Sequence, residues 1–339
     1  MKTRKAAMTV VFVLWMILTT LVLFEVAVRV TGYSSGYIYD PIYMPYSQTD
    51  GIPFVHKPGL DNARARGLIR INTDGLGLRS KHPGTADPAP KAPNEFRIAV
   101  AGDSFTFGDG IERCEDTYVC VMEDHLNDHA DERVFRAYNF GVSAYSVKEM
   151  AHTLSYRIPE VAPDLAVMAI IPDDFDLSRT CEVDKYGYAH NPKLSGFLDK
   201  DSIIKRLARN VHSVYFVRDM WYRRARKKGE HHERTMRIAE KLPESYGYVL
   251  RFRDRAQESG LHHLIVLLPT LRGDFGDIVR DRMREDNVEY LDLTFIRREF
   301  NAGDFKVSKY NRHPSAEVHK RIGEELAEYI LERFQSGVY

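Results

Sequence analysis

Ser104 and His313 are the two residues of this sequence whose types and surroundings best suit nucleophilic chemistry. Ser104 follows an apolar run, residues 98–101, that ends at Gly102, a pattern typical of a buried strand leading into a tight turn. Because ligands of parallel sheets bind outside the carboxyl ends of the strands, this position would present the Ser104 hydroxyl to a ligand. A serine here also suits a helix cap, and the stretch taken alone favours neither interpretation.

His313 stands immediately before a helix predicted near the C-terminus, and Pro314 suits the first turn of that helix. The positive potential at a helix N-terminus favours the neutral imidazole that a general base needs. Such a base, within reach of a hydroxyl, turns serine into a nucleophile for acyl transfer. Taken singly, His313 is equally well explained as a helix cap, so the fold must bring the two residues together.

The elements that would position these residues follow from the hydrophobic pattern. Short apolar segments predict strands at residues 98–101, 134–140, 165–171, 264–268 and 289–293. Helical spacing of apolar residues predicts helices at residues 117–127, 147–157, 244–259 and 318–334. Strands separated by helices of this length predict a parallel sheet with helices on both faces. The ends of the first three strands then carry Ser104, Gly141 and the pair Asp173 and Asp174.

The N-terminus predicts a membrane anchor. Residues 6–24 form an uncharged apolar run of 19 residues, close to the roughly 20 that a bilayer-spanning helix needs. Glu25 to Arg29 is a poor cleavage context, so we expect an uncleaved signal-anchor rather than a signal peptide. Lys2, Arg4 and Lys5 keep the short N-terminal end in the cytoplasm by the positive-inside rule, and the rest of the chain is then exported.

We therefore expect four regions along the chain. They are a cytoplasmic N-terminus (1–5), a transmembrane signal-anchor (6–31), an extracytoplasmic lead-in and linker (32–95) and the main domain (96–339) with an insertion at about 177–242. The lead-in contains a predicted strand and turn at residues 68–75, and the prolines of residues 81–94 indicate a linker. The insertion contains a predicted helix at residues 203–226 whose basic end, residues 223–228, is a solvated helix end or a contact for anionic lipid or glycan.

The amino-acid composition restricts the classes of partner and cofactor that we expect. The 48 basic and 48 acidic side chains balance, which argues against a nucleic-acid partner. The three cysteines, Cys114, Cys120 and Cys181, are too few for a disulfide scaffold, although one pair could bridge in an oxidising compartment. No His or Cys cluster has the spacing of zinc ligands, so we expect neither a metal nor another cofactor.

Taken in order, these motifs resemble the SGNH (GDSL-type) hydrolase family over roughly residues 68 to 335. The first block of the family is matched by Gly102, Asp103 and Ser104, extended by residues 105–108. Residues 72–79 look like the lead-in of membrane-anchored bacterial members, and residues 139–146 match the second block. The resemblance implies a three-layer α/β/α sandwich around a five-stranded parallel sheet, the flavodoxin-like SGNH fold.

The resemblance also implies roles for individual residues. Ser104 would be the nucleophile and His313 its general base. The oxyanion hole would comprise the backbone amides of Ser104 and Gly141 and the side chain at the third block, where Asp173 stands. Fixed donors of this kind stabilise the tetrahedral intermediate.

The sequence departs from the family pattern in two places. The third block normally has Asn followed by Asp, but here it is Asp173 followed by Asp174; an ionised Asp173 would repel the oxyanion. Asn311 stands where the family has the acid that orients the histidine, and an asparagine can fill that role, as in cysteine proteases. Asp292 and Asp304 are alternative partners for His313, and Asp103 and Asp174 are possible supporting residues.

The sequence thus favours a membrane-anchored, exported serine esterase at a bacterial inner membrane, with its catalytic domain in the periplasm. It would hydrolyse or transfer an acyl ester, such as an acetyl group, on an envelope glycan or lipid. The alternative is a catalytically degenerate module of the same fold that binds an acylated or glycan ligand. The sequence does not identify the acyl group, the acceptor or the oligomeric state.

Overall fold

A five-stranded parallel sheet lies at the centre of the molecule. The computed structural model describes residues 2–33, 39–66, 69–81, 83–84, 90–130, 132–178, 181–190, 210–225, 230–271 and 276–339. The strand order is β12-β11-β8-β6-β7, and all four neighbouring pairs are parallel. The strands are β6 (Glu95–Gly102), β7 (Val134–Gly141), β8 (Leu165–Ile170), β11 (His262–Leu267) and β12 (Tyr290–Asp292). The predicted fold class, a parallel sheet of five strands between helical layers, is confirmed.

Helices cover both faces of the sheet. One face packs on α3 (Tyr118–Asp128) and α9 (Ala316–Gln335), which also contact each other. The other face packs on α4 (Val147–Tyr156), α7 (Glu230–Glu258) and α8 (Gly276–Glu285). Alternate residues of β6 therefore enter different cores: Ile98 faces α3 and α9, and Ala101 faces α4. Strands buried on both faces need the continuous apolar sequence seen here.

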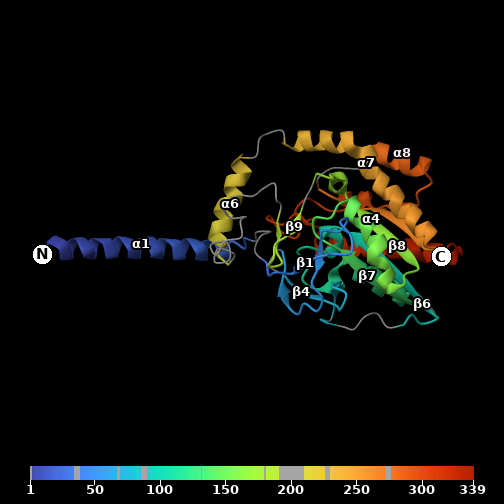
Figure 1. The fold of residues 1–339 in the computed structure, drawn as a ribbon, viewed down its shortest axis with the longest axis horizontal. Helices are drawn as coiled ribbons and strands as arrows, with labels where there is room; N and C mark the ends of the chain where they lie inside the picture. Colours follow the sequence, from blue (N-terminus) through green and yellow to red (C-terminus); the bar gives the residue numbers. More distant parts are fainter. Residues whose placement is uncertain are drawn as a thin grey trace.

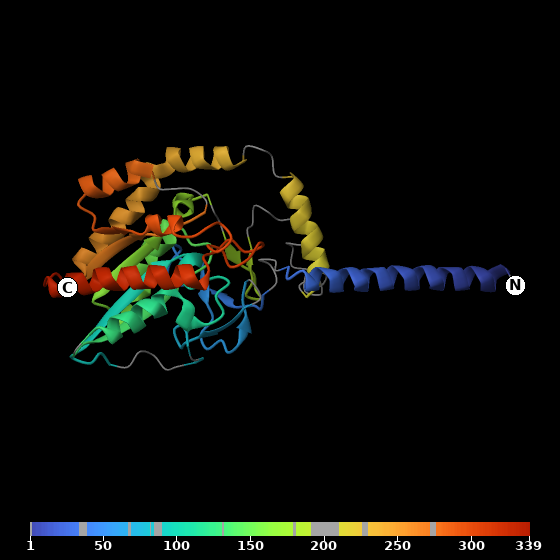
Figure 2. The same cartoon turned by 180° about the vertical axis from the view of Figure 1, so that it is seen from behind.

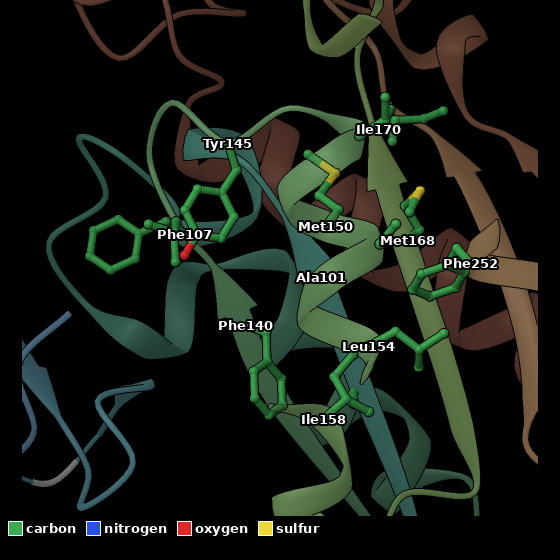
Figure 3. Close-up of a cluster of buried hydrophobic side chains, with 14 of the residues drawn as sticks. Ala101, Phe107, Phe140, Tyr145, Met150, Leu154, Ile158, Met168, Ile170 and Phe252 are labelled. Carbon is green, nitrogen blue, oxygen red and sulfur yellow. The ribbon is translucent and has the colours of Figure 1, made fainter. Parts of the chain in front are cut away.

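The core under α4 is built mainly from large apolar side chains that pack against one another (Figure 3). Met150 and Leu154 of α4 lie against Met168 of β8 and Phe252 of α7. The small side chain of Ala101 leaves room for them at the middle of the sheet. Burial of this apolar surface stabilises the strands that carry the candidate site. The gain in folding free energy is roughly 25 cal/mol for each Å² of apolar surface removed from water.

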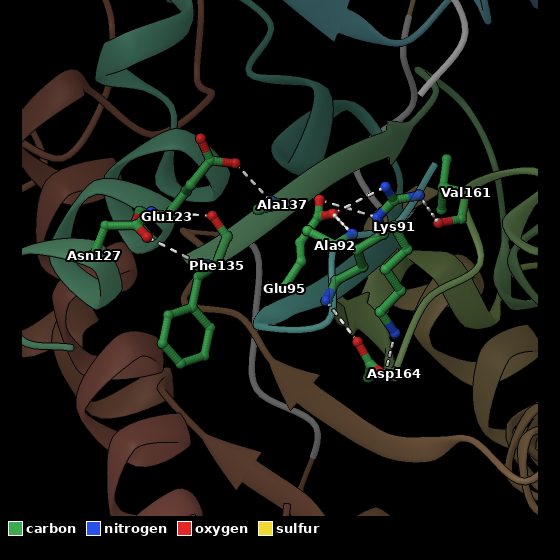
Figure 4. Close-up of polar contacts among 10 residues, drawn as sticks. Lys91, Ala92, Glu95, Glu123, Asn127, Phe135, Ala137, Val161 and Asp164 are labelled. Atoms are coloured by element: carbon green, nitrogen blue, oxygen red, sulfur yellow. Dashed lines mark hydrogen bonds and ion pairs between the residues drawn. The ribbon is translucent and has the colours of Figure 1, made fainter. Parts of the chain in front are cut away.

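Polar contacts hold the amino ends of the central strands (Figure 4). Asp164 accepts a hydrogen bond from the Arg97 backbone N at 2.7 Å and pairs with Lys91. On the other side of β7, Asn127 and Phe135 exchange two hydrogen bonds of 2.9 and 3.0 Å. These contacts leave the opposite edge of the sheet, where the carboxyl ends of the strands meet, for the candidate site.

The segment before the sheet packs into the same core. It forms the antiparallel pair β1 (Tyr43–Pro45) and β2 (Phe54–His56), and a small sheet of β3 (Ala63–Arg64), β4 (Arg70–Thr73) and β5 (Arg79–Ser80). Tyr43 and Phe54 are buried in one hydrophobic cluster with Tyr145 and Phe107 of the main domain. A further antiparallel pair consists of β9 (Glu182–Val183) and β10 (Ala189–His190).

The long helix α1 (Lys2–Val30) projects from the domain (Figures 1 and 2). Its span Arg4–Val30 includes a stretch of 18 residues with a mean hydropathy of 2.5 and no buried residue, so it is long and apolar enough to cross a membrane. The end of α1 packs on α6 (His212–Ala225), where Val28, Tyr33 and Tyr215 form a buried cluster. Tyr310, in the chain segment before α9, packs on Tyr33 with ring centroids 5.4 Å apart.

Several helix boundaries differ from the predictions. The helix expected over residues 244–259 begins at Glu230 and continues through Pro243, and α8 was not predicted. The helix α9 begins at Ala316, and Pro314 lies before it, paired with Lys306 in an isolated bridge. Pro314 is thus not in the first helical turn as predicted. In the insertion, α6 begins at His212; the predicted helical residues 203–209 and part of the basic run lie outside the described residues.

The remaining elements of the described residues are short helical turns. They are α2 (Ser104–Phe107), η1 (Cys114–Asp116), η2 (Ile158–Val161), η3 (Pro172–Phe175) and η5 (Thr294–Arg298). Three of them, α2, η3 and η5, follow β6, β8 and β12 at the carboxyl edge of the sheet. This edge therefore gathers the residues that the sequence singles out.

Candidate active site

Ser104 opens the turn that follows the central strand β6. Asp103 is the N-cap of this turn, and its Oδ1 accepts a hydrogen bond of 2.8 Å from the Phe105 backbone N. Gly102 allows the turn to fold back, because a Cβ at this position would lie 1.8 Å from the Thr106 hydroxyl oxygen. Ser104 is 9% exposed. The cap role therefore belongs to Asp103, and the Ser104 hydroxyl is left for other contacts.

The Ser104 hydroxyl meets the imidazole of His313, from a segment far away in the sequence. The Oγ of Ser104 lies 2.8 Å from Nε2 of His313 and 3.3 Å from Oδ2 of Asp103. On the other side of the ring, Nδ1 of His313 lies 2.6 Å from Oδ1 of Asn311. The His313 backbone N donates to the same Asn311 oxygen at 3.1 Å.

These contacts determine the tautomer of His313. The amide oxygen of Asn311 can only accept, so Nδ1 carries the proton and donates it to Asn311. In the neutral ring, Nε2 is then unprotonated and accepts a hydrogen bond from the Ser104 hydroxyl. This is the arrangement in which a general base can take the hydroxyl proton.

The alternative acidic partners of His313 have other contacts. Asp292 pairs with Arg280 at 2.7 Å and also accepts hydrogen bonds from Thr294. Asp304 accepts a hydrogen bond from the side chain of Asn301. Asn311 is thus the residue that contacts Nδ1 of the His313 ring.

A buried carboxylate, Asp109, faces His313 from the loop after α2, and the sequence analysis did not single it out. Its Oδ2 lies 3.9 Å from Nε2 of His313 and accepts a hydrogen bond of 2.9 Å from the Ser143 hydroxyl. Asp109 is 2% exposed. The guanidinium groups of the half-buried Arg66 and the buried Arg79 interact with its charge, which offsets the cost of burying it. The only sequence signal was its position between two loop glycines.

Arg79 holds the loop that carries Asp109. Its guanidinium donates hydrogen bonds to the carbonyl oxygens of Phe107 (2.8 Å) and Gly108 (2.7 Å), and to those of Ile111 and Glu112. Burial lowers the pKa of Arg79 below its ordinary value. One side chain from the segment before the sheet thus satisfies the backbone of the loop between the turn α2 and α3.

Gly141, at the end of β7, packs directly under the turn α2. A Cβ at this position would lie 2.4 Å from the Phe107 backbone N, so the close approach requires glycine. The Gly141 backbone N donates to Oδ1 of Asn139 at 2.9 Å, and Nδ2 of Asn139 donates to the Thr106 carbonyl at 2.8 Å. Asn139, not singled out from the sequence, therefore ties β7 to the turn and already uses the Gly141 amide.

The two acids after β8 have different environments. Asp174 is fully buried, and its Oδ2 accepts a hydrogen bond of 2.9 Å from the Ile171 backbone N, which closes the turn η3. Asp173 is half-buried in the same turn, which follows β8, the strand next to β6. Asp174 is thus held by its own turn, and the carboxylate of Asp173 stands at the edge of the sheet that carries Ser104.

The described residues contain no group of three or more His, Cys, Asp or Glu side chains arranged to hold a metal ion. Among the cysteines, the Sγ atoms of Cys114 and Cys120 lie 2.8 Å apart, whereas Cys181 lies elsewhere, in the segment before β9. The site consists of a serine, a histidine and an asparagine in hydrogen-bonded series, with a carboxylate beside Nε2 of the histidine.

No family model matches this sequence, and no curated protein matches it either. Similar solved structures include a G-D-S-L family lipolytic protein of Desulfitobacterium hafniense, with 13% identity over 68% of this chain and 98% of its own, and a TM-score of 0.41. TesA has 13% identity over 68% of this chain and 95% of its own, with the same TM-score of 0.41. Axe2, an acetylxylan esterase from Geobacillus stearothermophilus, has 12% identity over 69% and 93%, and a TM-score of 0.41.

Proposed function

We propose that this chain is a membrane-anchored serine hydrolase of the SGNH type that cleaves or transfers an acyl ester. The observation that supports this most directly is the hydrogen-bonded series Ser104, His313 and Asn311 at the carboxyl edge of the parallel sheet. A nucleophile, a base and a residue that orients the base are the parts that acyl transfer requires.

In the proposed reaction, Nε2 of His313 takes the proton of Ser104 as Oγ attacks the carbonyl carbon of the ester. The resulting imidazolium then gives this proton to the departing alcohol, and the acyl group remains on Ser104. A water or a second alcohol, deprotonated by His313, releases the acyl group and restores the hydroxyl. Asn311 keeps the ring in the productive tautomer throughout.

The oxyanion is assigned to the backbone amides of Ser104 and Gly141 and to the side chain of Asp173. Gly141 would have to share or release its bond to Asn139 to serve in this role. Asp173 donates only as the protonated acid. Asp109 compensates for the neutral side chain of Asn311, which supplies no negative charge to the histidine. The charge of Asp109, 3.9 Å from Nε2, stabilises the imidazolium instead.

The proposal places the enzyme at a bacterial inner membrane. Helix α1 would cross the bilayer once, with Lys2, Arg4 and Lys5 in the cytoplasm and the domain in the periplasm. The substrate would be an acylated glycan or lipid of the envelope, with acetyl as one candidate acyl group.

The second candidate function is non-catalytic: the chain would bind acylated or glycan ligands without hydrolysing them. The engaged amide of Gly141 and the carboxylate of Asp173 favour it, because both weaken the oxyanion hole.

Labelling with a fluorophosphonate distinguishes the two candidates. We expect the full chain in detergent to be labelled on the peptide that contains Ser104, and to hydrolyse an aryl acetate. Ser104→Ala should abolish both, and His313→Ala should slow both. Ser336→Ala, at an exposed serine beyond α9, is the matched control and should change neither. Absence of labelling at every pH would support the binder instead.

A further inference from the structure

The first turn of α6 is attached to the last turns of α1. The carboxylate of Glu25 accepts hydrogen bonds from the backbone N atoms of His212 (2.9 Å) and Ser213 (2.8 Å). These are N–H groups that a helix start cannot satisfy internally. Arg29 donates to the Asn210 carbonyl at 2.7 Å. The start of α6 therefore stays at the level of Glu25 along α1.

Glu25 marks the end of the uncharged part of α1. The uncharged residues 6–24 number 19, and at 1.5 Å per residue they extend about 28 Å, close to the roughly 30 Å of a hydrocarbon core. If α1 spans the membrane as proposed above, Glu25 lies at the boundary between acyl chains and headgroups. The N-terminus of α6 then lies at the same depth.

Helix α6 runs across the axis of α1 in both views of the molecule (Figures 1 and 2). With α1 along the membrane normal, α6 would extend along the membrane surface. One side of α6 is used within the protein: Tyr215 is 3% exposed and packs with Val28 and Tyr33, and Phe216 contacts Phe24.

The opposite side of α6 is apolar and exposed. Val217 is 48% exposed, Met220 38% and Trp221 64%. Residues spaced by three and four positions lie on one helix face, so these side chains form a single stripe. The exposed Arg224 follows one turn later on the same face. A helix with an apolar stripe containing tryptophan, next to a basic residue, is typical of helices that lie in the membrane interface.

We propose that α6 is an interfacial helix whose apolar stripe inserts between the headgroups of the phospholipid bilayer that α1 crosses. Val217, Met220 and Trp221 contact the upper acyl chains, and Arg224 contacts lipid phosphate. The partner is the lipid surface itself. This inference rests on the proposed membrane anchor, and it adds a second contact with the bilayer that fixes the orientation of the domain.

The two tryptophans of the chain, Trp15 in α1 and Trp221 in α6, test the two claims separately. The full chain is reconstituted in vesicles of phosphatidylcholine and phosphatidylglycerol, brominated either near the headgroup or near the chain end. In the variant Trp15→Phe, Trp221 should be quenched more by the shallow bromines. In Trp221→Phe, Trp15 should be quenched by the bromines deep in the bilayer.

Each outcome decides one claim. Quenching of Trp15 without quenching of Trp221 overturns the interfacial helix and leaves the anchor. Absence of both overturns the anchor and with it this inference. Stronger quenching of Trp221 by the deep bromines also overturns an interfacial position. Met220→Asp in the Trp15→Phe chain should reduce the quenching of Trp221, whereas Glu240→Gln, at an exposed position on α7, should leave it unchanged. A Met220→Asp variant quenched as strongly as its parent counts against the stripe.

Discussion

Replacing Asp109 by Asn removes a negative charge from beside the reacting nitrogen of His313 while it keeps an oxygen that accepts from Ser143. For a separation of 3.9 Å, the charge interaction with an imidazolium is about 4 kcal/mol at an effective dielectric constant of about 20 and about 1 kcal/mol in water. Asp109 is buried, but the His313 side chain is 29% exposed, so we take an intermediate value. About 2 kcal/mol corresponds to a roughly thirty-fold lower kcat/KM.

The assay is aryl-acetate hydrolysis by the full chain, measured as kcat/KM against pH. In the proposed mechanism the neutral form of His313 is the base, and loss of the nearby negative charge favours this neutral form. The acid limb of the profile should therefore move to lower pH while the plateau falls. A rate within about twofold of wild type, which is under about 0.5 kcal/mol, would refute an electrostatic role for Asp109.

A lower plateau with an unmoved acid limb would indicate a structural role, through Ser143 and the loop, instead of an effect of charge. The companion variant Asn311→Asp places a carboxylate beside Nδ1 of His313, which lies 2.6 Å from Oδ1 of Asn311 in the wild type. Combined with Asp109→Asn, it should restore most of the lost rate, because the imidazolium regains a counter-charge. No recovery in the double variant contradicts the compensation.

Three further predictions follow from other contacts. Asp173→Asn should raise kcat by up to about a hundredfold, because it supplies the missing donor; an unchanged or lower rate removes Asp173 from the oxyanion hole. Under oxidised glutathione, Cys114 and Cys120 should form the one disulfide, leaving Cys181 to alkylation in peptide maps, and the bridge should add about 2 kcal/mol of stability; alkylation of all three contradicts it. Burial lowers the pKa of His319 to about 3, so from about pH 6.5 downward the unfolded chain binds a proton that the folded chain does not, and the free energy of unfolding falls by about 1.4 kcal/mol per pH unit. In the variant His319→Asn, the free energy of unfolding, measured by thermal unfolding between neutral and acid pH, should fall less steeply with falling pH, by the contribution of one proton. A slope identical to that of the wild type would refute the low pKa of His319.

The sheet could be predicted from the sequence because its strands are buried on both faces. Residues 165–170 are apolar without interruption, and residues 98–101 alternate only between small and branched side chains that fit the two cores. Such runs are hard to place elsewhere in a fold. Helix α8 escaped prediction because only Ile278, Val279 and Met283 in its ten residues are apolar.

The candidate site was only partly predictable for a different reason. Ser104 and His313 lie in local patterns, a strand end and a segment before a helix, which the sequence displays directly. The position of Asp109 depends on a loop whose course is determined by Arg79, a residue of the lead-in, and no local pattern connects the two. The engagement of the Gly141 amide likewise depends on the rotamer of Asn139, which sequence spacing does not encode.

The contact between Tyr33 and Tyr310 joins the foot of the tether to the segment that presents the histidine. If α1 crosses a membrane as proposed, this packed joint would hold the domain at a constant distance from the bilayer, which a flexible linker would not do. Ester substrates carried by lipids would then reach the candidate site by lateral diffusion in the membrane. Only acyl groups at the height of the site above the bilayer would meet Ser104.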